Sequence, residues 1–320
     1  MILPGSALGL GPRAEGALTQ PERPPFVQLV VASVRSITRL LESPLLTVGE
    51  FRCPPDDVAW HELNLIGDLP HVVFPRIPVL IQHLGDAPVL ATPNQAMLYN
   101  GGQFYTRELR SQEGDNCVYI ELPHESLALL AEEGSAFVDG GYRLVASHAP
   151  ADPRTYLRQH LLVRHLRGPD PDPFLAEEAA AALVLDALAQ RPRNAQFGRL
   201  PTRRSHRELA EAAKAELAVS LDRNLSLQDL AQRLYTSAFH LARVFRAETG
   251  FSLQGFRQSL RLRAALERLA SSAVDLSALA LELGFSSHSH FTERFRNEFG
   301  VAPSQVREAR HVDALLQRIA

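Results

Sequence analysis

An internal repeat in the last hundred residues constrains this sequence more than any other feature. Four apolar positions recur 49 residues later: Leu227, Leu230, Ala231 and Leu234 return as Leu276, Leu279, Ala280 and Leu283. After one inserted residue, a second set recurs 50 residues later: Leu241, Phe245, Gly250 and Phe256 return as Phe291, Phe295, Gly300 and Val306. A repeat of this kind indicates one supersecondary unit present twice. In each copy, two helical apolar patterns separated by a short break and ended by a glycine predict a helix-turn-helix.

Proline usage supports an all-helical C-terminal third. Of the 22 prolines, 21 lie at or before Pro201, and proline breaks the interior of a helix. Upstream of the repeat, Ser205 and Glu208 have the spacing of a capping box and predict a helix that begins there and runs to about Leu221. A helix over residues 253–269 is predicted to join the two units and to hold them in a fixed relative orientation.

The rest of the chain has a different character. From about Phe51 to Leu122 short apolar runs alternate with turn residues, which predicts strands in a small sandwich or barrel. Residues 154–190 have apolar residues at helical spacing, interrupted at 168–173 by glycine, proline and aspartate residues that break a helix. This pattern predicts a pair of helices. Residues 1–25 are rich in glycine, proline and alanine without periodicity and predict a mobile tail.

Charge and cysteine content narrow the class of protein. The chain of 320 residues exceeds one compact domain and carries a net charge of -3. Residues 1–202 have a balance of -7 and residues 203–320 a balance of +4, which points to a polyanion partner for the basic part. Cys53 and Cys117 form no metal-binding or redox spacing and favour a reducing compartment. With no membrane-length apolar run and no basic, apolar leader, we expect a cytoplasmic protein that does not contact the membrane.

A helical wheel divides the second helix of each unit into two faces. Leu241 and Phe245, like Phe291 and Phe295, fall on the inward face. The outward face, with Thr292 at its edge, holds nine candidate DNA-binding residues: Phe239, His240, Arg243, Arg246, Ser289, His290, Thr292, Glu293 and Arg296. A helix fits the DNA major groove, where arginine bonds guanine, a carboxylate accepts from cytosine and an apolar ring touches a thymine methyl. A solvated helix face is the alternative for one isolated unit, and duplication favours DNA reading.

The repeat resembles the DNA-binding region of AraC/XylS-type transcription regulators over about 100 residues. The second unit carries the most specific pattern, which consists of Leu279-Ala280, Gly284-Phe285, Ser289 to Phe291, Phe295, Phe299-Gly300 and Pro303. Two positions depart from the family pattern. Tyr235 stands in the turn where glycine is common, and Glu293 stands where arginine is frequent. The first departure should be tolerated, whereas the second puts the base preference of the second unit in question.

The resemblance implies an α+β protein with an N-terminal cupin-like β-barrel, a helical connector and a C-terminal all-α double helix-turn-helix domain. The expected boundaries place the sensing domain at 26–150, the connector at 151–202 and the DNA-binding domain at 203–320. The implied function is sequence-specific regulation of transcription, without catalysis or a cofactor, under a small-molecule effector bound in the barrel. The implied partners are double-stranded DNA, the effector, a second copy of the chain and, as a further candidate, RNA polymerase.

Two other functions compete with this interpretation. A cupin-type metal-dependent enzyme needs a cluster of histidine and carboxylate ligands. The histidines of the predicted barrel are widely spaced without an H-x-H pair, so we interpret them as structural: His61, His71, His83 and His124. An effector-independent DNA-binding adaptor is the second alternative. Three arginines are candidates for an anionic effector, with solvated surface residues as the simpler interpretation: Arg76, Arg107 and Arg110.

Overall fold

The computed structural model describes residues 35–132, 143–189, 200–219, 221, 225–269, 275–308 and 311–319. The strands are β1 (Ser36–Glu42), β2 (Thr47–Cys53), β3 (Asn64–Leu65), β4 (His71–Pro75), β5 (Val79–His83), β6 (Val89–Ala91), β7 (Gln95–Tyr99), β8 (Phe104–Leu109), β9 (Asp115–Glu121) and β10 (His148–Pro150). The helices are the 3-10 helix η1 (Val58–His61), α1 (His124–Glu132), α2 (Pro153–Leu166), α3 (Pro173–Ala189), α4 (Leu200–Val219), α5 (Leu227–Arg233), α6 (Ala238–Thr249), α7 (Leu253–Arg268), α8 (Leu276–Glu282), α9 (His288–Phe299), α10 (Pro303–Arg307) and α11 (Val312–Ile319). The predicted tail at 1–25 lies outside the described residues.

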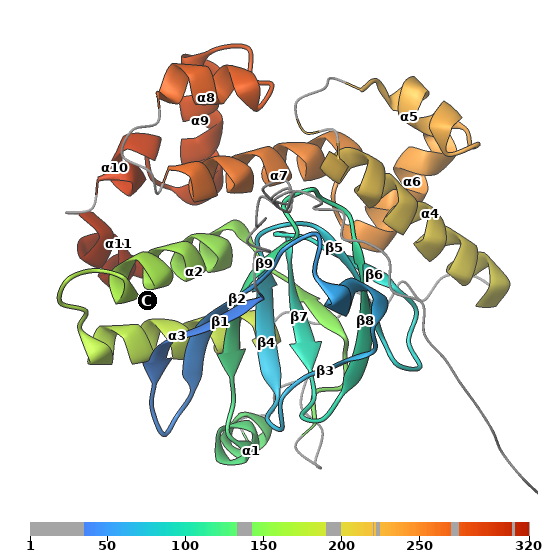
Figure 1. Ribbon diagram of the computed structural model, residues 1–320. Helices are drawn as coiled ribbons and strands as arrows, with labels where there is room; N and C mark the ends of the chain where they lie inside the picture. The colour runs from blue at the N-terminus through green and yellow to red at the C-terminus, as the bar shows by residue number, and fades with distance from the viewer. Residues whose placement is uncertain are drawn as a thin grey trace, which may run out of the picture. The chain divides into compact units, whose positions relative to one another are not determined.

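The strands form two antiparallel sheets (Figure 1). One sheet has the order β1-β2-β9-β4-β7-β10, and the other has the order β3-β8-β5-β6. No ladder joins the two sheets among the described strands, so they form an open sandwich and not a continuous barrel. The alternation of β4 shows how the layers are built, because Val72 and Phe74 belong to the core under the helices while Val73 belongs to the core between the sheets.

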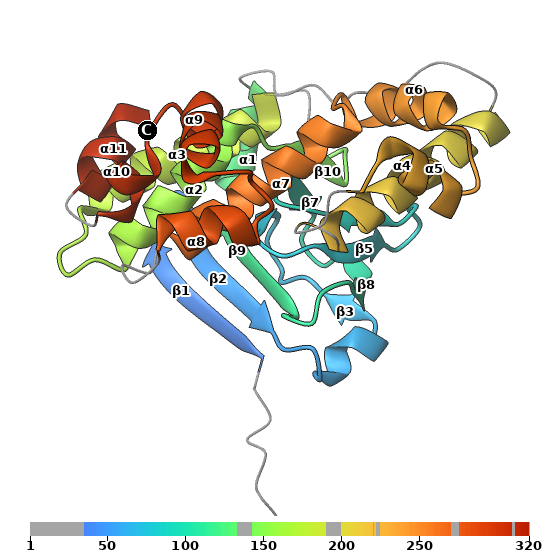
Figure 2. The same cartoon turned by 90° about the horizontal axis from the view of Figure 1, so that it is seen from above.

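The helices fall into two groups with separate cores. The outer face of the larger sheet shares one apolar core with α2, α3, the inner side of α7, α8, α9 and α11. The first helix-turn-helix, formed by α5 and α6, has its own core with α4 and the start of α7. Figure 2 shows α7 between these groups, with α8 and α9 toward one end and α4 to α6 toward the other. The second repeat unit is therefore packed on the larger sheet together with α2 and α3, whereas the first is not.

The predicted organisation is confirmed as an N-terminal β region followed by a C-terminal helical helix-turn-helix region. The paired helices of each repeat and the joining helix appear as expected. The capping box at Ser205 is wrong, because Ser205 lies inside α4, which begins at Leu200. Pro201 explains the earlier start, since the first turn of a helix needs no backbone N–H at that position. The domain boundaries stay predictions, although α11 packs on α2 and α3 and not within the second unit alone.

Candidate nucleic-acid interface and sensing cavity

Short polar signals fix the ends of the helices in the first unit. Ser226 and Asp229 form a capping box that starts α5, and the Ser237 hydroxyl accepts a hydrogen bond from the His240 N–H at 3.2 Å to start α6. Gly250 ends α6 in the left-handed conformation with a φ of 77°. These caps determine where α5 begins and where α6 begins and ends.

The faces of α6 lie as the helical wheel predicts. Leu241 and Phe245 are completely buried. On the opposite side the Phe239 ring is 91% exposed, and Arg243 and Arg246 are also exposed. His240 is half-buried, and its Nδ1 lies 3.3 Å from the Arg243 Nη2. The arrangement presents one aromatic ring and two guanidinium groups to solvent on a single helix face.

The second unit repeats this geometry with different chemistry. Phe291 and Phe295 are completely buried, while Ser289, Glu293 and Arg296 are exposed on α9 and Thr292 is half-exposed. Glu293 and Arg296 form no ion pair in the described part of the chain, so the carboxylate faces solvent.

The candidate set from the helical wheel leaves out one further cation on α9. Arg294 is exposed on α9, and its Nε donates to the Nε2 of His290 at 3.4 Å. The Nδ1 of His290 lies 3.0 Å from the Ser286 hydroxyl. The i, i+4 spacing from His290 to Arg294 was the signal available in the sequence.

Arg261 on α7 bridges the segment that follows α4 and the turn of the second unit. Its Nε donates to the Leu221 carbonyl at 2.5 Å, and its Nη1 donates to the Gly284 carbonyl at 3.1 Å. Arg257, one turn earlier, donates to the Leu225 carbonyl before α5 at 3.1 Å. These bonds from two successive turns of α7 tie both units to the joining helix.

Another face of α7 contacts the N-terminal β region and α2 through Ser259, Arg263 and Glu267, which recur every four residues and which we call the α7 stripe. The Arg263 side chain has no exposed surface. Its Nη2 donates to the Ala151 carbonyl at 3.0 Å, and its guanidinium lies 5.3 Å from the centre of the Tyr156 ring. The Ser259 hydroxyl donates to the Asn94 Oδ1, between β6 and β7, at 3.0 Å.

Glu267 ends the α7 stripe in a cluster of charges. Its carboxylate accepts a hydrogen bond from the Tyr156 hydroxyl at 2.9 Å, lies 3.3 Å from the Arg76 Nε and lies 3.5 Å from the His160 Nδ1. Burial alone would raise the pKa of Glu267, but the Arg76 charge, His160 and the Tyr156 hydroxyl lower the pKa to about 2. Arg76 also pairs with Glu50 of β2 at 2.5 Å. The Glu267 carboxylate is therefore ionised in the folded chain, with Arg76, His160 and Tyr156 around it.

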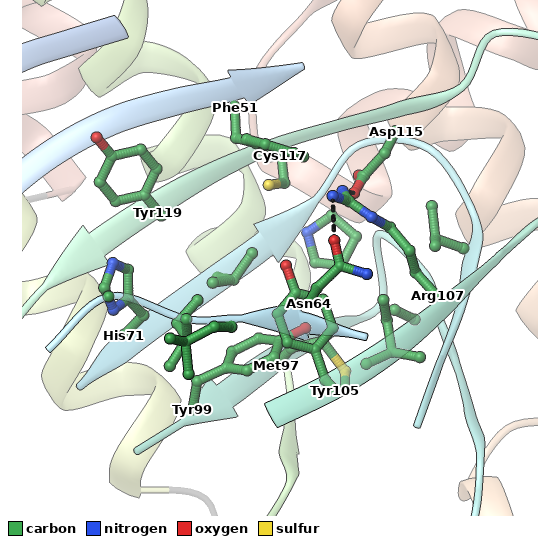
Figure 3. Close-up of a pocket in the computed structure, with 18 of the residues that line it drawn as sticks. Phe51, Asn64, His71, Met97, Tyr99, Tyr105, Arg107, Asp115, Cys117 and Tyr119 are labelled. Atoms are coloured by element: carbon green, nitrogen blue, oxygen red, sulfur yellow. Dashed lines mark hydrogen bonds and ion pairs between the residues drawn. The ribbon is translucent and has the colours of Figure 1, made fainter. Parts of the chain in front are cut away.

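A cavity of about 490 Å³ lies between the two sheets (Figure 3). Its wall is mostly aromatic and aliphatic, with a few polar groups, and includes Phe51, Val73, Met97, Tyr99, Tyr105, Tyr119, Asn64, His71, Arg107, Asp115 and Cys117. The wall also includes Arg35, Arg39, Glu62 and Glu121. The volume and the mostly apolar wall are typical of a small-molecule site.

Arg107 is the central polar group of this cavity. Its Nη2 donates to the Asn64 Oδ1 at 2.8 Å, and its Nη1 pairs with the Asp115 Oδ2 at 3.2 Å. The guanidinium lies over the rings of Phe51 and Trp60, at 4.9 and 5.5 Å from their centres. The Arg107 Nε is buried without a hydrogen-bond partner. Burial raises the pKa of Asp115 to about 6, and Arg107 opposes that shift.

The candidate arginines and histidines of the N-terminal region differ in how deeply they are buried. The interpretation as solvated surface residues is wrong for Arg107, which is 4% exposed, and for Arg76, whose side chain is 7% exposed. Arg110 is partly exposed and pairs with Glu108 at 3.0 Å. His71 lines the cavity and His83 is buried, and burial lowers the pKa of both, whereas His61 and His124 are exposed.

Two properties of the described residues bear on a metal-dependent enzyme and on a membrane-spanning protein. Among the described residues, no group of three or more histidine, cysteine or acidic side chains could hold a metal ion. Among the described helices, none combines the length and apolar character needed to cross a membrane.

Comparison with known proteins identifies relatives of the C-terminal helical region. A family model described as a helix-turn-helix domain matches residues 230–309. MarA, the multiple antibiotic resistance protein of Escherichia coli, is 34% identical over 28% of this chain and 69% of its own length. The transcriptional activator AarP of Providencia stuartii is 31% identical over 32% of this chain and 80% of its own length. The uncharacterized regulator YfiF of Bacillus subtilis is 35% identical over 42% of this chain, and the match spans less than half of YfiF, 43%.

Solved structures of similar proteins cover either the helical region or most of the chain. An AraC-type DNA-binding domain protein from Chromobacterium violaceum is 26% identical over 32% of this chain and 93% of its own, with a TM-score of 0.31. ToxT from Vibrio cholerae is 13% identical over 82% of this chain and 98% of its own, with a TM-score of 0.32.

Proposed function

The chain belongs to the AraC/XylS family of DNA-binding transcription regulators, and from this premise we propose that its two helix-turn-helix units read one bipartite DNA element under the control of a small molecule. The observation that carries the proposal is the attachment of both units to one helix, because Arg257 of α7 donates to the Leu225 carbonyl directly before α5 and Arg261 donates to the Gly284 carbonyl in the turn of the second unit. Two reading helices held on one rigid connector enter successive major grooves, whose centres lie about 10 bp apart.

The exposed residues of the two units assign different roles to the two half-elements. Arg243 of α6 is exposed and suited to a bidentate contact with guanine, and the exposed Phe239 ring suits a thymine methyl. Ser289 and Glu293 stand at comparable places on α9. We therefore propose a non-palindromic element whose halves differ in sequence. His240, Arg246, His290, Thr292 and Arg296 complete the proposed DNA-binding set.

The cavity between the sheets is the proposed effector site. Its largely apolar and aromatic wall suits a small organic molecule, and the buried Arg107 offers an unused Nε donor to an acceptor group on that molecule. A ligand that engages Arg107 competes with Asp115 and Asn64 for the same guanidinium. Binding would therefore redistribute hydrogen bonds in the wall of the cavity.

The proposed route to DNA binding runs through strands that carry cavity residues on one face and α7 contacts on the other. In β2, Phe51 lines the cavity while its neighbour Glu50 pairs with Arg76. Arg76 in turn lies 3.3 Å from Glu267 of the α7 stripe. A shift of β2 on ligand binding would thus change the contacts of the helix that holds both reading units, which is a two-state coupling between distinct sites.

Three further features belong to the proposal. A second copy of the chain is a partner, and the exposed Phe174 and Leu185 of α3, at 76% and 47%, offer it an apolar surface. RNA polymerase is a partner of the promoter-bound state. The protein acts in the cytoplasm, where its DNA is accessible.

Selection of random duplexes on the full-length chain tests the proposed function. We expect two conserved blocks of different sequence whose centres are about one helical turn apart. Arg243→Ala should relax preference within one block and leave the other unchanged. A single conserved block, or two identical blocks, would contradict dual reading by unlike units. A thermal-shift screen of metabolites on the same protein tests the effector, and loss of a positive shift in Arg107→Met would locate it in the cavity.

A further inference from the structure

The turn of the first unit holds a residue with no visible use in the fold. Tyr235, between α5 and α6, has a φ of 50° and is the one non-glycine residue with positive φ in the described part of the chain. This left-handed conformation is disfavoured for a bulky side chain. The backbone bonds of the turn do not involve the side chain, because the Tyr235 N–H donates to the Gln232 carbonyl at 3.1 Å and the Thr236 N–H to the Ala231 carbonyl at 3.0 Å.

The second unit makes the same turn with a glycine. Gly284 occupies the equivalent position with a φ of 75°. Its N–H donates to the Leu281 carbonyl and the Phe285 N–H donates to the Ala280 carbonyl, both at 2.9 Å. The turn therefore forms without a side chain at this position. A tyrosine in the first unit adds backbone strain that the repeat shows to be avoidable.

The Tyr235 side chain gives no packing in return. It is 98% exposed, so its ring lies in solvent. It stands two residues before Ser237, the N-cap of α6, and four residues before the 91% exposed Phe239. This position is continuous with the proposed reading face of α6. The second unit, with Gly284 and Ser289, has no aromatic side chain at either place.

We propose that Tyr235 is a DNA-contacting residue whose hydroxyl donates a hydrogen bond to a backbone phosphate beside the groove that α6 enters. The inference rests on the proposed function. The side chains of α6 face the base edges, and the turn that leads into the helix lies toward the edge of the groove, where the phosphates run. Tyrosine is among the side chains that bond phosphate oxygens, and such contacts set the register of a reading helix without selecting a base. Strain retained at an exposed position is typical of a functional site.

The chemistry of this contact gives it a distinct signature. A neutral hydroxyl releases no counterion, so its loss should not change how affinity depends on salt. A contact to phosphate should also contribute equally on every sequence. Arg243, by contrast, should contribute more on the selected element than on an unrelated duplex. Tyr235 and Arg243 can therefore be told apart in one assay.

The test measures fluorescence anisotropy of full-length variants on the selected element and on an unrelated duplex at several salt concentrations. We expect Tyr235→Phe to weaken binding roughly ten-fold on both duplexes, as for loss of a hydrogen bond to a charged group, with an unchanged salt slope. Tyr235→Gly should weaken binding as much without lowering the melting temperature, because glycine suits the left-handed turn. Leu129→Ala, which shortens an exposed apolar side chain on α1, is the control and should leave both affinities and the salt slope unchanged.

Several results would overturn the inference. Wild-type affinity in Tyr235→Phe removes the hydroxyl contact while leaving the proposed function intact. A clear fall in the melting temperature of Tyr235→Gly shows that the ring supports the turn. Normal DNA affinity with loss of promoter activation points to a protein partner instead of DNA. A wild-type chain that binds neither duplex overturns the proposed function as well, so the two failures are distinguishable.

Discussion

Replacing Glu267 with glutamine tests whether the α7 stripe holds the helical region to the sheet by charge. The substitution keeps the shape of the side chain and an oxygen that accepts from the Tyr156 hydroxyl, which now lies at 2.9 Å. It removes the negative charge that faces Arg76 at 3.3 Å and His160 at 3.5 Å. Because the Glu267 side chain is only 24% exposed, solvent screens this charge weakly.

The pKa of Glu267 gives the size of the effect. Its ordinary value is 4.5 and its value in the folded chain is about 2, which corresponds to about 3 kcal/mol of folding free energy near neutral pH. Since the folded pKa lies below the unfolded one, this stabilisation is fully present above about pH 4.5 and disappears as the pH falls through about 2. We expect Glu267→Gln to cost about 3 kcal/mol near pH 7 and about 2 kcal/mol near pH 3.5.

Urea unfolding at the two pH values measures this difference, followed by Trp60 fluorescence for the sheets and by far-ultraviolet circular dichroism for the helices. Glu216→Gln is the control, because its pair with Arg233 at 3.0 Å is exposed and should contribute less than about 1 kcal/mol. An equal cost of Glu267→Gln at both pH values would show that shape and not charge is lost. A cost no larger than that of the control would refute the buried charge cluster itself.

Four further substitutions separate the contributions of core packing, cavity electrostatics and DNA reading. Phe295→Ala should destabilise the second unit by about 3–5 kcal/mol, whereas Arg243→Ala should leave the melting temperature unchanged and cost about 1–3 kcal/mol of specific DNA binding; equal melting losses would contradict the assigned faces. The pKa of Asp115, raised by burial to about 6, lies above its unfolded value, so ionisation should lower stability as the pH rises from about 4 to about 6; Asp115→Asn should lose that slope in thermal melts. Glu293→Ala should strengthen binding to all duplexes alike if the carboxylate opposes phosphates, and relaxed preference at one base pair would instead show a base contact.

The helix-turn-helix units could be predicted because their information is local. Apolar residues at helical spacing select the buried face, and Ser237 and Gly250 fix where α6 begins and ends within the same short stretch. The same reasoning failed at Ser205, because a capping-box pattern also fits the exposed face of a helix interior. Pro201 was the better signal for the start of α4.

Part of the cavity wall could be predicted from the alternation of side chains along a strand. In β8, Arg107 shares its side of the strand with Tyr105 and Leu109, both of which pack with the core between the sheets. An arginine on the apolar side of a strand is a candidate site residue. The two-residue alternation of side chains in β8 would therefore have identified Arg107. The partners of Arg107 and Glu267 could not be predicted, because Asn64 and Arg76 lie far away in the sequence and no local pattern relates them.

The two copies of the repeat are attached to the N-terminal region in different ways. The second unit shares an apolar core with the sheet, α2 and α3, and separating it would expose a large buried surface. The first unit has its own core, and its supporting helix α4 contacts the sheet through polar bonds such as the Leu90 N–H donating to the Glu211 carboxylate at 2.7 Å. Such bonds exchange with water at little net cost. Loosening the contacts of β6 or β7 should therefore free the first unit from the sheets more easily than the second, while Arg257 and Arg261 keep both units on α7. We expect Asn94→Ala, which removes the bond to Ser259 of α7, to change the DNA affinity of the full-length chain without changing the spacing of the two half-elements in duplex selection. A changed spacing would mean that α7 does not hold the two units in a fixed relation.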